Sequence, residues 1–289
     1  MFLSDPKTLS TPRGTFTWRE GGDANGAPVV MIHGWPESSY CWEHVGRHLK
    51  DGLRVIAPDL RGLGDSERTQ GREHYTKQAL ALDVVSMLDE LGIREFQLIG
   101  HDWGGIVAQE VALAIPDRVS RMIIMNIAII NNLKGNMEVI QKVRSGSTKS
   151  YWYQHFQQEP GLAEGMIPGK EDVWIGHFVT GAVKPIPEDA VAEYVRMYSI
   201  PGTPAAGANY YRAFSDDAKR WSALSDHKWT VPSLYIYGNK DKVILPEYLN
   251  HIEECFESIR VEEVDAGHFL QEEKPEEVAG HMNNFLETA

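Results

Sequence analysis

The sequence predicts an α/β fold, in which helices flank a mostly parallel sheet and a helical segment is inserted near the middle of the chain. From residue 28 onward, short apolar runs alternate with segments of helical periodicity. Most runs are continuously apolar, as is typical of strands covered on both faces of a parallel sheet. From about residue 130 to 222 this alternation stops, and aromatic segments punctuated by proline and glycine take its place.

The apolar runs predict six strands, over residues 28–34, 54–60, 96–102, 119–127, 232–241 and 261–268. Residues 79–92 predict a helix, because their apolar side chains recur at helical spacing and Gly92 is placed to end it. Residues 104–116 predict a second helix, which stops at Pro116. Within the inserted segment, residues 187–198 begin with proline and acidic residues, which suit a helix start.

These patterns divide the chain into two lobes of one protein. We expect residues 1–129 and 223–289 to form the sheet-centred core domain, and residues 130–222 to form an all-helical cap (lid) domain. The cap would cover the carboxyl ends of the strands, where open α/β sheets bind their ligands.

Composition narrows the class of protein and of partner. The 289 residues are 42% hydrophobic and 24% charged, which suits a globular chain with a sizeable core and excludes a disordered one. The formal net charge is −13 and the chain shows no lysine and arginine cluster, which argues against nucleic acid as a partner. The acidic balance is otherwise typical of soluble proteins.

Neither a membrane span nor a secretory signal is predicted. The longest apolar run, residues 122–130, includes Asn126 and is far shorter than the roughly 20 residues that a bilayer requires. The first residues show no basic flank followed by an apolar stretch. Cys41 and Cys255 allow one disulfide at most, so a reducing compartment is the simpler interpretation and we expect a cytoplasmic protein.

The segment LIGHDWGG (98–105) carries the most chemical information. It predicts a strand, a tight Gly-x-Asp-x-Gly turn and a helix, with Asp102 projecting from the strand end. Gly100 and Gly104 suit this turn because a side chain at either place would clash, and the helix that follows offers N–H groups to a negative charge. A solvated aspartate in an ordinary strand–helix turn is the alternative.

Two later strands also end in polar residues that suit catalysis. Asp241 follows one strand in GNKDKV (238–243), and His268 follows the next in DAGHF (265–269). Nucleophile, acid and histidine in this order form a triad of Asp102, Asp241 and His268. A histidine is more often structural, but this one ends the last strand directly after an aspartate ends the preceding one.

The whole chain from about residue 15 resembles the α/β-hydrolase fold, in the branch with an aspartate nucleophile. HGWPESSYCW (33–42), GHDWGG (100–105) and the places of Asp241 and His268 carry the resemblance. It implies an eight-stranded, mostly parallel sheet with an inserted cap, and an oxyanion hole formed by the backbone N–H groups of Trp35 and Trp103. The branch includes epoxide hydrolases, haloalkane dehalogenases and fluoroacetate dehalogenases.

Two segments of the cap resemble epoxide hydrolases, in which two tyrosines hold the epoxide oxygen. They are YQHFQQEPG (153–161) and NYYRAF (209–214), so the resemblance implies Tyr153 and Tyr211 as the ring-opening pair, with Tyr151 and Tyr210 as nearby alternatives. The Phe-Gln of the first segment is shifted by one residue against the family pattern. Buried core tyrosines with satisfied hydroxyls are the structural alternative.

A dehalogenase using the same Asp nucleophile and Asp-His pair is the second hypothesis. It requires two N–H donors for the halide, and Trp103 offers one, with Trp152 or Trp174 as the second. Two departures oppose it, because many haloalkane dehalogenases have Asn where Trp35 stands and fluoroacetate dehalogenases usually have Arg where Trp103 stands. A third hypothesis is an inactive hydrolase fold that serves as a binding module, which the filled catalytic positions disfavour.

The expected substrate is a small apolar epoxide, with water as the second reactant. Aromatic side chains predict the pocket, and those expected to line it are Trp35, Trp103, Trp152, Phe156 and Tyr210, with Trp174 and Phe178 nearby. The sequence lacks both GxGxxG and GxxxxGK[ST], so no nucleotide cofactor is expected. His44 and His48 lack a third ligand and are expected on a helix face, so no metal is predicted. A homo-oligomer stays open.

Overall fold

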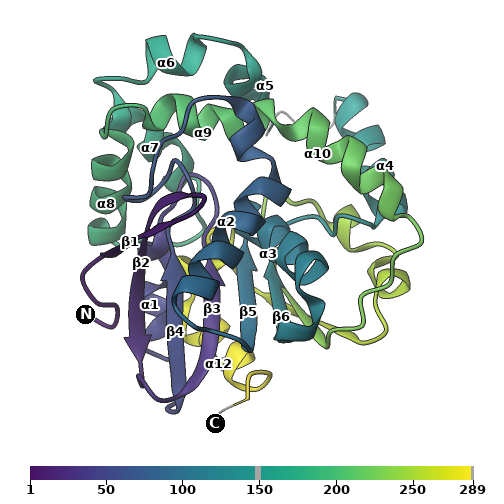
Figure 1. Ribbon diagram of the computed structural model, residues 1–289. Coiled ribbons are helices and arrows are strands. Elements are labelled where there is room, and N and C mark those ends of the chain that lie inside the picture. The colour runs from purple at the N-terminus through teal and green to yellow at the C-terminus, as the bar shows by residue number, and fades with distance from the viewer. Residues whose placement is uncertain (147–150, 288–289) are drawn as a thin grey trace.

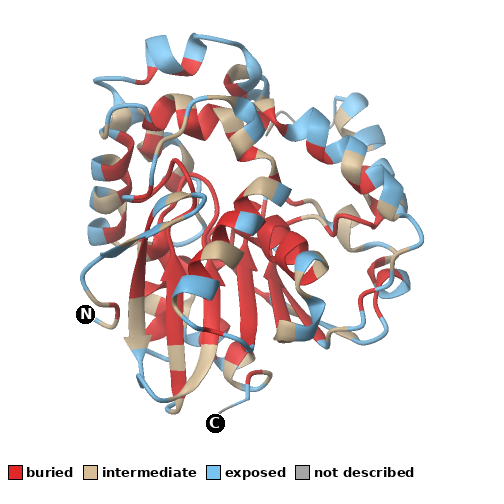
Figure 2. Cartoon of the chain, in the orientation of Figure 1, coloured by how far each residue is buried: buried red, intermediate tan, exposed pale blue. Residues whose placement is uncertain are grey.

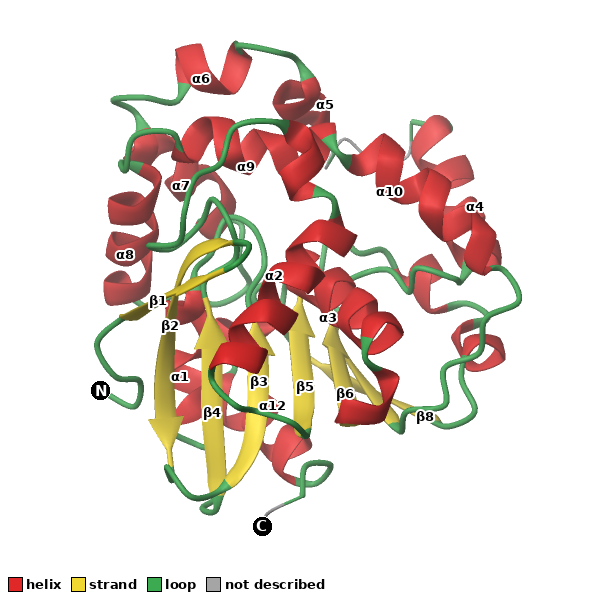
Figure 3. Cartoon of the chain, in the orientation of Figure 1, coloured by secondary structure: helices red, strands yellow, loops and turns green. Residues whose placement is uncertain are grey.

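The structure is a computed structural model that describes residues 1–146 and 151–287. Its described strands form one sheet of eight in the order β1-β2-β4-β3-β5-β6-β7-β8 (Figure 3). The strands are β1 (Lys7–Thr11), β2 (Gly14–Gly22), β3 (Ala27–Ile32), β4 (Leu53–Pro58), β5 (Phe96–His101), β6 (Val119–Met125), β7 (Ser233–Gly238) and β8 (Ile259–Val264).

The pairing confirms a mostly parallel sheet. β1 pairs with β2 and β2 with β4 in antiparallel fashion, whereas every pairing from β4 through β3, β5, β6 and β7 to β8 is parallel. All six strands predicted from the apolar runs are present. Every residue of β5 and of β7 is buried, whereas β8 at the edge is mostly accessible. The continuous apolar runs therefore mark the strands that are covered on both faces.

Helices cover both faces of the sheet. Figure 1 shows α2 (Lys77–Glu90) and α3 (Trp103–Ala114) in front of the strands, and α1 (Glu43–Gly46) and α12 (Pro275–Asn283) behind them. A short helix, α11 (Leu270–Glu273), precedes α12. Short 3-10 helices lie in the connections, at Ser39–Trp42, Arg72–Tyr75, Pro116–Arg118, Ser222–Leu224, Pro246–Leu249 and Ile252–Cys255.

Helix α2 begins two residues earlier than the sequence predicts. Its N-cap is Thr76, whose side chain accepts a hydrogen bond from the N–H of Ala79 at 3.2 Å. Gly92 follows the helix with a φ of 70°, as expected for a residue that ends it. The prediction that His44 and His48 share a helix face is wrong, because α1 ends at Gly46.

A layer of helices, residues 133–221, lies between β6 and β7 in the sequence. We call it the helical layer. Figures 1 and 2 show it above the carboxyl ends of the parallel strands, with its outer surface exposed. Its helices are α4 (Leu133–Arg144), α5 (Trp152–Gln158), α6 (Leu162–Met166), α7 (Glu171–Val179), α8 (Glu188–Tyr198), α9 (Thr203–Arg212) and α10 (Phe214–Trp221). The division of the chain into domains at residues 130 and 222 stays a prediction.

Three further observations concern partners and chemistry. Cys41 and Cys255 are both buried and free. Across residues 1–146 and 151–287, no helix is long and apolar enough to cross a bilayer. The same residues contain no cluster of three or more histidine, cysteine, aspartate or glutamate side chains arranged to hold a metal ion.

Candidate active site

Asp102 lies at the turn between β5 and α3, and its backbone is in an unusual conformation. Its φ of 48° and ψ of −131° place the side chain above the end of the sheet. The close packing around it excludes side chains at the neighbouring glycines. A Cβ added at Gly100 would lie 2.4 Å from the carbonyl oxygen of Gly104, and one added at Gly104 would lie 2.3 Å from that of His33. The physical reason for both glycines of the motif is therefore visible.

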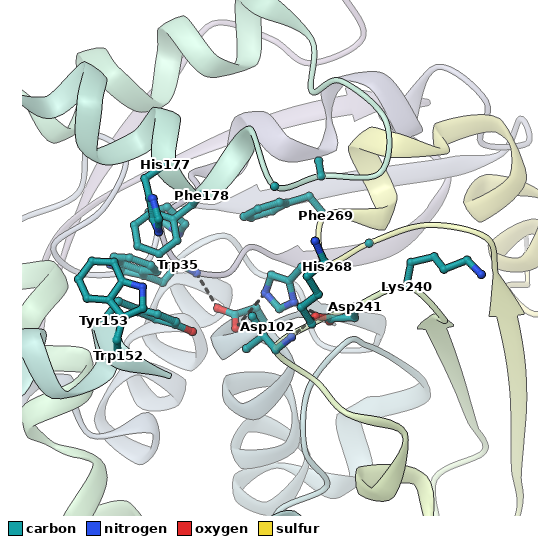
Figure 4. A pocket seen from close by; sticks show the side chains of 16 residues that line it. Trp35, Asp102, Trp152, Tyr153, His177, Phe178, Lys240, Asp241, His268 and Phe269 are labelled. Atoms are coloured by element: carbon teal, nitrogen blue, oxygen red, sulfur yellow. Dashed lines mark hydrogen bonds and ion pairs between the residues drawn. The ribbon is translucent and has the colours of Figure 1, made fainter. Parts of the chain in front are cut away.

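The loop after β3 approaches the same carboxylate. The backbone N–H of Trp35 donates to Oδ1 of Asp102 at 2.8 Å (Figure 4). The N–H of Trp103 also acts on this carboxylate and helps to lower the pKa of Asp102. The approach is possible only without a side chain at residue 34, because a Cβ on Gly34 would lie 2.5 Å from the Asp102 Cβ. Both N–H groups predicted for the oxyanion hole are thus near Asp102.

His268 and Asp241 come from the loops after β8 and β7. Oδ1 of Asp241 accepts backbone N–H groups from Val243 at 2.7 Å and Ile244 at 3.1 Å. Its Oδ2 is 2.7 Å from Nδ1 of His268, and Nε2 of His268 is 3.4 Å from Oδ2 of Asp102. The three side chains predicted as a triad therefore lie together, with the imidazole between two carboxylates (Figure 4).

The charges of the triad stabilise each other. Burial disfavours the charged imidazole, but the carboxylates of Asp241 and Asp102 outweigh it and raise the pKa of His268 well above its usual value. Burial likewise opposes ionisation of Asp102, and the hydrogen bond and charge of His268 outweigh it and lower the pKa of Asp102. The resting site is therefore a buried ion pair with an ionised Asp102.

Asn126, which follows β6, does not contact the imidazole ring. Its Nδ2 donates to the carbonyl oxygens of Gly267 at 2.9 Å and His268 at 3.0 Å, and its Oδ1 accepts the N–H of Gly238 at 2.8 Å. Asn126 therefore ties the ends of β7 and β8 together. Asp241, and not Asn126, is the residue that contacts Nδ1 of His268.

Tyr153 and Tyr211 lie together across the site from the triad. Tyr153 stacks on Trp35 with ring centroids 5.5 Å apart, and Tyr211 meets Tyr153 edge-on at 5.7 Å. Both side chains are buried. Burial raises the pKa of each phenol, and the nearby charge of Asp102 raises it further. Both hydroxyls therefore stay protonated and can act as hydrogen-bond donors near Asp102.

The two alternative tyrosines are engaged elsewhere. The hydroxyl of Tyr151 donates to the carbonyl oxygen of Val243 at 2.5 Å, and that of Tyr210 donates to the carbonyl oxygen of Arg61 at 2.8 Å. Of the four tyrosines, Tyr153 and Tyr211 are the pair that faces Asp102.

A pocket of about 400 Å³ opens in front of Asp102. Figure 4 shows Trp35, Trp152, Tyr153, Phe178 and Phe269 around it. Asp102, Asp241 and His268 form part of its wall. The wall is largely apolar, and its polar residues are those of the triad together with Tyr153, His177, Lys240 and Lys242. A mostly apolar wall suits a small apolar ligand. Phe269 was missed by sequence reasoning, although its place directly after His268 is a usable signal.

Three of the five residues predicted to line the pocket are misplaced. Trp103, Phe156 and Tyr210 are absent from the described lining residues, whereas Trp35 and Trp152 are present. Phe156 packs behind, against Trp152 and Trp174, Trp103 packs against Tyr211, and Tyr210 packs against Tyr75. These side chains form the layer that supports the pocket wall. Trp174 is likewise not among the lining residues.

Sequence reasoning also missed the support behind His268. Nε2 of His101 lies 2.7 Å from the carbonyl oxygen of His268, and its Nδ1 lies 2.9 Å from Oε2 of Glu37. The carbonyl only accepts, so Nε2 carries the proton and Nδ1 of the neutral ring accepts one from a protonated Glu37. Burial lowers the pKa of His101 to about 4 and, with the charge of Asp102, raises that of Glu37 to about 8, in keeping with this arrangement.

Residues 27–275 match the α/β hydrolase fold family. This match covers most of the chain and includes strands β3 to β8, the turn at Asp102 and the loop at His268. The chain belongs to this family. The sheet and the family predicted from the sequence are thereby confirmed.

Named relatives of this α/β hydrolase are epoxide hydrolases. It is 28% identical to epoxide hydrolase A of Mycobacterium tuberculosis, over 92% of each chain. It is 32% identical to a soluble epoxide hydrolase of a Corynebacterium species, over 87% of each chain. The predicted resemblance to the epoxide hydrolase family, and with it the prediction of an enzyme, is confirmed.

Solved structures agree with the sequence relatives. The epoxide hydrolase A structure from Mycobacterium thermoresistibile superposes with a TM-score of 0.84 at 25% identity, covering 98% of each chain. An epoxide hydrolase structure from Vigna radiata has a TM-score of 0.80 at 26% identity and covers 98% of this chain and 97% of that one.

Proposed function

We propose that this α/β hydrolase opens small apolar epoxides to vicinal diols through a covalent ester on Asp102. The observation that carries the proposal is the position of Asp102 between Tyr153 and Tyr211 on one side and His268 on the other. This arrangement provides a nucleophile, acids for the epoxide oxygen, and a base for water around one pocket, with Tyr153 in its wall and Tyr211 packed against Tyr153. The epoxide hydrolases among the relatives support the same reaction.

Ring opening is the first step. Oδ1 of Asp102 is engaged by the Trp35 N–H at 2.8 Å, which leaves Oδ2 to attack a ring carbon. The new bond joins Oδ2 to carbon as the carbon–oxygen bond of the ring breaks. Tyr153 and Tyr211 hold the developing alkoxide, and one of them transfers its proton to it. Because the pKa of Asp102 is lowered, the nucleophile is ionised without a base.

Ester formation also prepares the base for the second step. One of the two carboxylate charges that raise the pKa of His268 disappears when Asp102 becomes an ester. The pKa of His268 then falls, so the imidazole releases its proton, which restores the phenol of the tyrosine that protonated the alkoxide, and the neutral imidazole can accept a proton from water. Asp241 keeps the ring oriented through its 2.7 Å contact with Nδ1.

Water then hydrolyses the ester. His268 removes a proton from water, and the oxygen attacks the carboxyl carbon of Asp102. Oδ1 becomes the oxyanion and is stabilised by the N–H groups of Trp35 and Trp103. Collapse breaks the bond between that carbon and the substrate oxygen, which takes the proton held by His268 and leaves as the second hydroxyl of the diol. The carboxylic acid of Asp102 then returns its own proton to His268. Epoxide and water are thus converted to diol, and Asp102 is regenerated.

The helical layer has a proposed role as the cap of this reaction. It contributes Tyr153 from α5 and Tyr211 from α9, so the acids come from the cap and the triad from the core. The buried free cysteines fit a reducing cytoplasm, which we propose as the compartment. The assigned substrates are an apolar epoxide and water.

Dehalogenation is less well supported by the geometry. It requires two N–H donors that point at a halide beside Asp102. Of the three tryptophans predicted for that role, Trp152 lines the pocket, whereas Trp103 and Trp174 are not among the described lining residues. Of the tyrosine pair that an epoxide oxygen requires, Tyr153 lines the pocket, and Tyr211 is not among the described lining residues but packs edge-on against Tyr153 and Trp35.

The ester intermediate can be trapped directly. His268→Gln removes the base, so incubation with styrene oxide should raise the intact protein mass by the mass of one epoxide, located on Asp102 by peptide mapping. Asp102→Asn in the same background is the control and should stay unmodified. Failure of a folded His268→Gln variant to gain mass with styrene oxide or with aliphatic epoxides would contradict the proposal. Halide release from 1-chlorobutane without diol formation would favour the dehalogenase.

A further inference from the structure

We propose that Lys77 and Asp217 form a buried pair of positioning residues for ring opening, which acts through Trp103 and Tyr211. This inference rests on the proposed function. Neither residue lines the described pocket or enters the reaction steps, and neither belongs to a motif in the sequence. Lys77 is the first residue of α2 in the core, and Asp217 lies in α10 of the helical layer.

The side chain of Lys77 connects three elements. Its Nζ lies 2.9 Å from Oδ2 of Asp217, while Oδ1 of the same carboxylate accepts the backbone N–H of Lys77 at 2.8 Å. Nζ also donates to the carbonyl oxygen of Tyr210, directly before Tyr211 in α9. The same ammonium group lies 4.0 Å from the ring centroid of Trp103. One cation thus holds α10, the backbone beside Tyr211, and the residue after Asp102.

Stability alone does not account for this pair. The side chains of Lys77 and Asp217 are 0% and 1% exposed, so both charges have lost their hydration. Desolvation of a buried ion pair largely cancels its attraction, and apolar or neutral replacements of such pairs are often no less stable. A buried pair in contact with an active-site residue is therefore a candidate for a role in the chemistry.

The position of the ammonium group indicates that role. Trp103 has Lys77 over its ring, and Tyr211 contacts it edge-on at 5.6 Å. A cation over an indole ring is held by the ring quadrupole, which fixes the ring plane. Trp103 in turn packs against the Tyr211 phenol, whose pKa burial raises, and its hydrogen bond to the phenol partly opposes that rise. The Lys77 bond to the Tyr210 carbonyl fixes the backbone of the same phenol.

The field of Lys77 also extends to the reacting charge. The Asp102 carboxylate acts on Lys77 and opposes the effect of burial, which lowers the pKa of Lys77. During ring opening the negative charge moves from Asp102 to the oxygen held by Tyr153 and Tyr211. Because Lys77 contacts the ring of Trp103 and the backbone carbonyl of Tyr210, it fixes the residues that follow Asp102 and precede Tyr211.

The test is the double variant Lys77→Met/Asp217→Asn, which removes both charges without leaving either one unpaired. We measure ester formation with styrene oxide by intact mass in the His268→Gln background, and kcat and KM for diol formation in the otherwise native enzyme. The rate of ester formation and kcat/KM should both fall about tenfold, the scale of one desolvated cation–π contact. The value of kcat should fall less, because it also includes ester hydrolysis, in which the Tyr211 phenol does not hold the reacting oxygen.

A second pair on the same helix provides the matched control. Arg220 of α10 contacts Glu110 of α3 at 3.0 Å, and so also joins the helical layer to the core. Arg220→Met/Glu110→Gln removes that pair without touching Trp103 or the backbone of Tyr210. If the Lys77 pair only docks the cap, both double variants should slow ester formation equally. Our inference requires a much smaller effect from the Arg220 pair.

Two outcomes overturn the inference, one supports it, and one shows instead that the proposed function fails. A folded Lys77→Met/Asp217→Asn variant with native kcat/KM and native ester formation overturns it. Equal losses in the two double variants also overturn it, and show a docking role. If the His268→Gln protein with a native Lys77 pair forms no ester, the proposed function fails first, so the two failures are distinguishable. Native thermal unfolding of the Lys77 variant, together with slow ester formation, supports the inference.

Discussion

The two oxygens of Asp102 lie in different surroundings, and this difference divides the chemistry. Oδ1 accepts the Trp35 N–H at 2.8 Å, whereas Oδ2 is 3.4 Å from Nε2 of His268. In the proposed mechanism, the first becomes the oxyanion and the second attacks carbon. Because the Trp35 N–H binds Oδ1, Oδ2 stays available to the substrate on the side of His268. The loop after β3 and the loop after β8 therefore approach different oxygens of the same carboxylate.

At the scale of single residues, we expect the hydroxyls of Tyr153 and Tyr211 to affect catalysis far more than the hydroxyl of the neighbouring Tyr210. Tyr211→Phe and Tyr153→Phe should each lower kcat/KM for styrene oxide by about 100-fold, because each removes a donor to the epoxide oxygen. Tyr210→Phe is the matched control, since its hydroxyl donates to the Arg61 carbonyl. Steady-state kinetics would contradict the assignment if Tyr211→Phe and Tyr210→Phe gave the same value.

The protonation of Glu37 should be visible in the pH dependence of stability. Its pKa is raised by burial from 4.5 to about 8, so the folded protein binds more protons than the unfolded one. The Glu37 contribution is fully present below about pH 4.5 and is lost as the pH rises toward 8. Glu37→Gln should flatten this decline in Tm between pH 5 and 8. The pKa of His268 is also raised, so its contribution to Tm likewise declines as the pH rises above the usual pKa of histidine.

At the scale of elements, close contacts between β3 and α3 hold the nucleophile turn in place. A Cβ at Gly104 would lie 2.3 Å from the carbonyl oxygens of Ile32 and His33, so α3 could not keep its position against β3. The strand order, in which β3 and β5 are neighbours, makes this contact unavoidable. Gly104 is therefore required by the packing of α3 against β3. The sequence predicted a glycine at this position from the tight turn alone.

Two glycine variants test this requirement in helices. Gly104→Ala should lower the free energy of unfolding by about 3 kcal/mol or more, since backbone atoms would have to move. Gly176→Ala in α7 meets no atom within 4 Å and should raise the free energy of unfolding by about 0.5–1 kcal/mol through helix propensity. Urea unfolding measures both. Equal effects would show that the contact with β3 is unimportant.

The contact between α2 and α10 depends on a pair of opposite charges, Lys77 and Asp217. Lys77→Met alone would leave Asp217 buried without its cation, and we expect a loss of about 3–5 kcal/mol in the free energy of unfolding. Adding Asp217→Asn should recover most of that loss. Chemical denaturation of the single and double variants gives the coupling, and strictly additive losses would contradict the pairing.

At the scale of the whole molecule, the active site lies between two parts of the chain that are far apart in sequence. The triad comes from loops after β5, β7 and β8, and the tyrosines come from α5 and α9 of the helical layer. The net charge is −13, whereas the pocket wall is largely apolar. We therefore expect the pocket, and not the charge of the protein, to select the proposed apolar substrate.

The sequence by itself determined six of the eight described strands, the tight turn at Asp102 and the positions of Asp241 and His268, whereas β1 and β2 were not predicted from its apolar runs. These features depend on local patterns, because continuous apolar runs, glycine at a crowded turn and a polar residue at a strand end each have a short-range cause. The family resemblance added Tyr153 and Tyr211, and the structure places both beside Asp102.

Only the tertiary structure decided which aromatic side chains line the pocket and which support it. Trp103, Phe156 and Tyr210 are aromatic, as is expected of residues that line an apolar pocket, yet they pack one layer behind its wall. The pairing of Lys77 with Asp217 joins residues 140 positions apart, and no local pattern marks it. Whether a side chain faces a ligand or a neighbour is set by how helices from distant segments pack, so it emerges only when the whole chain is folded.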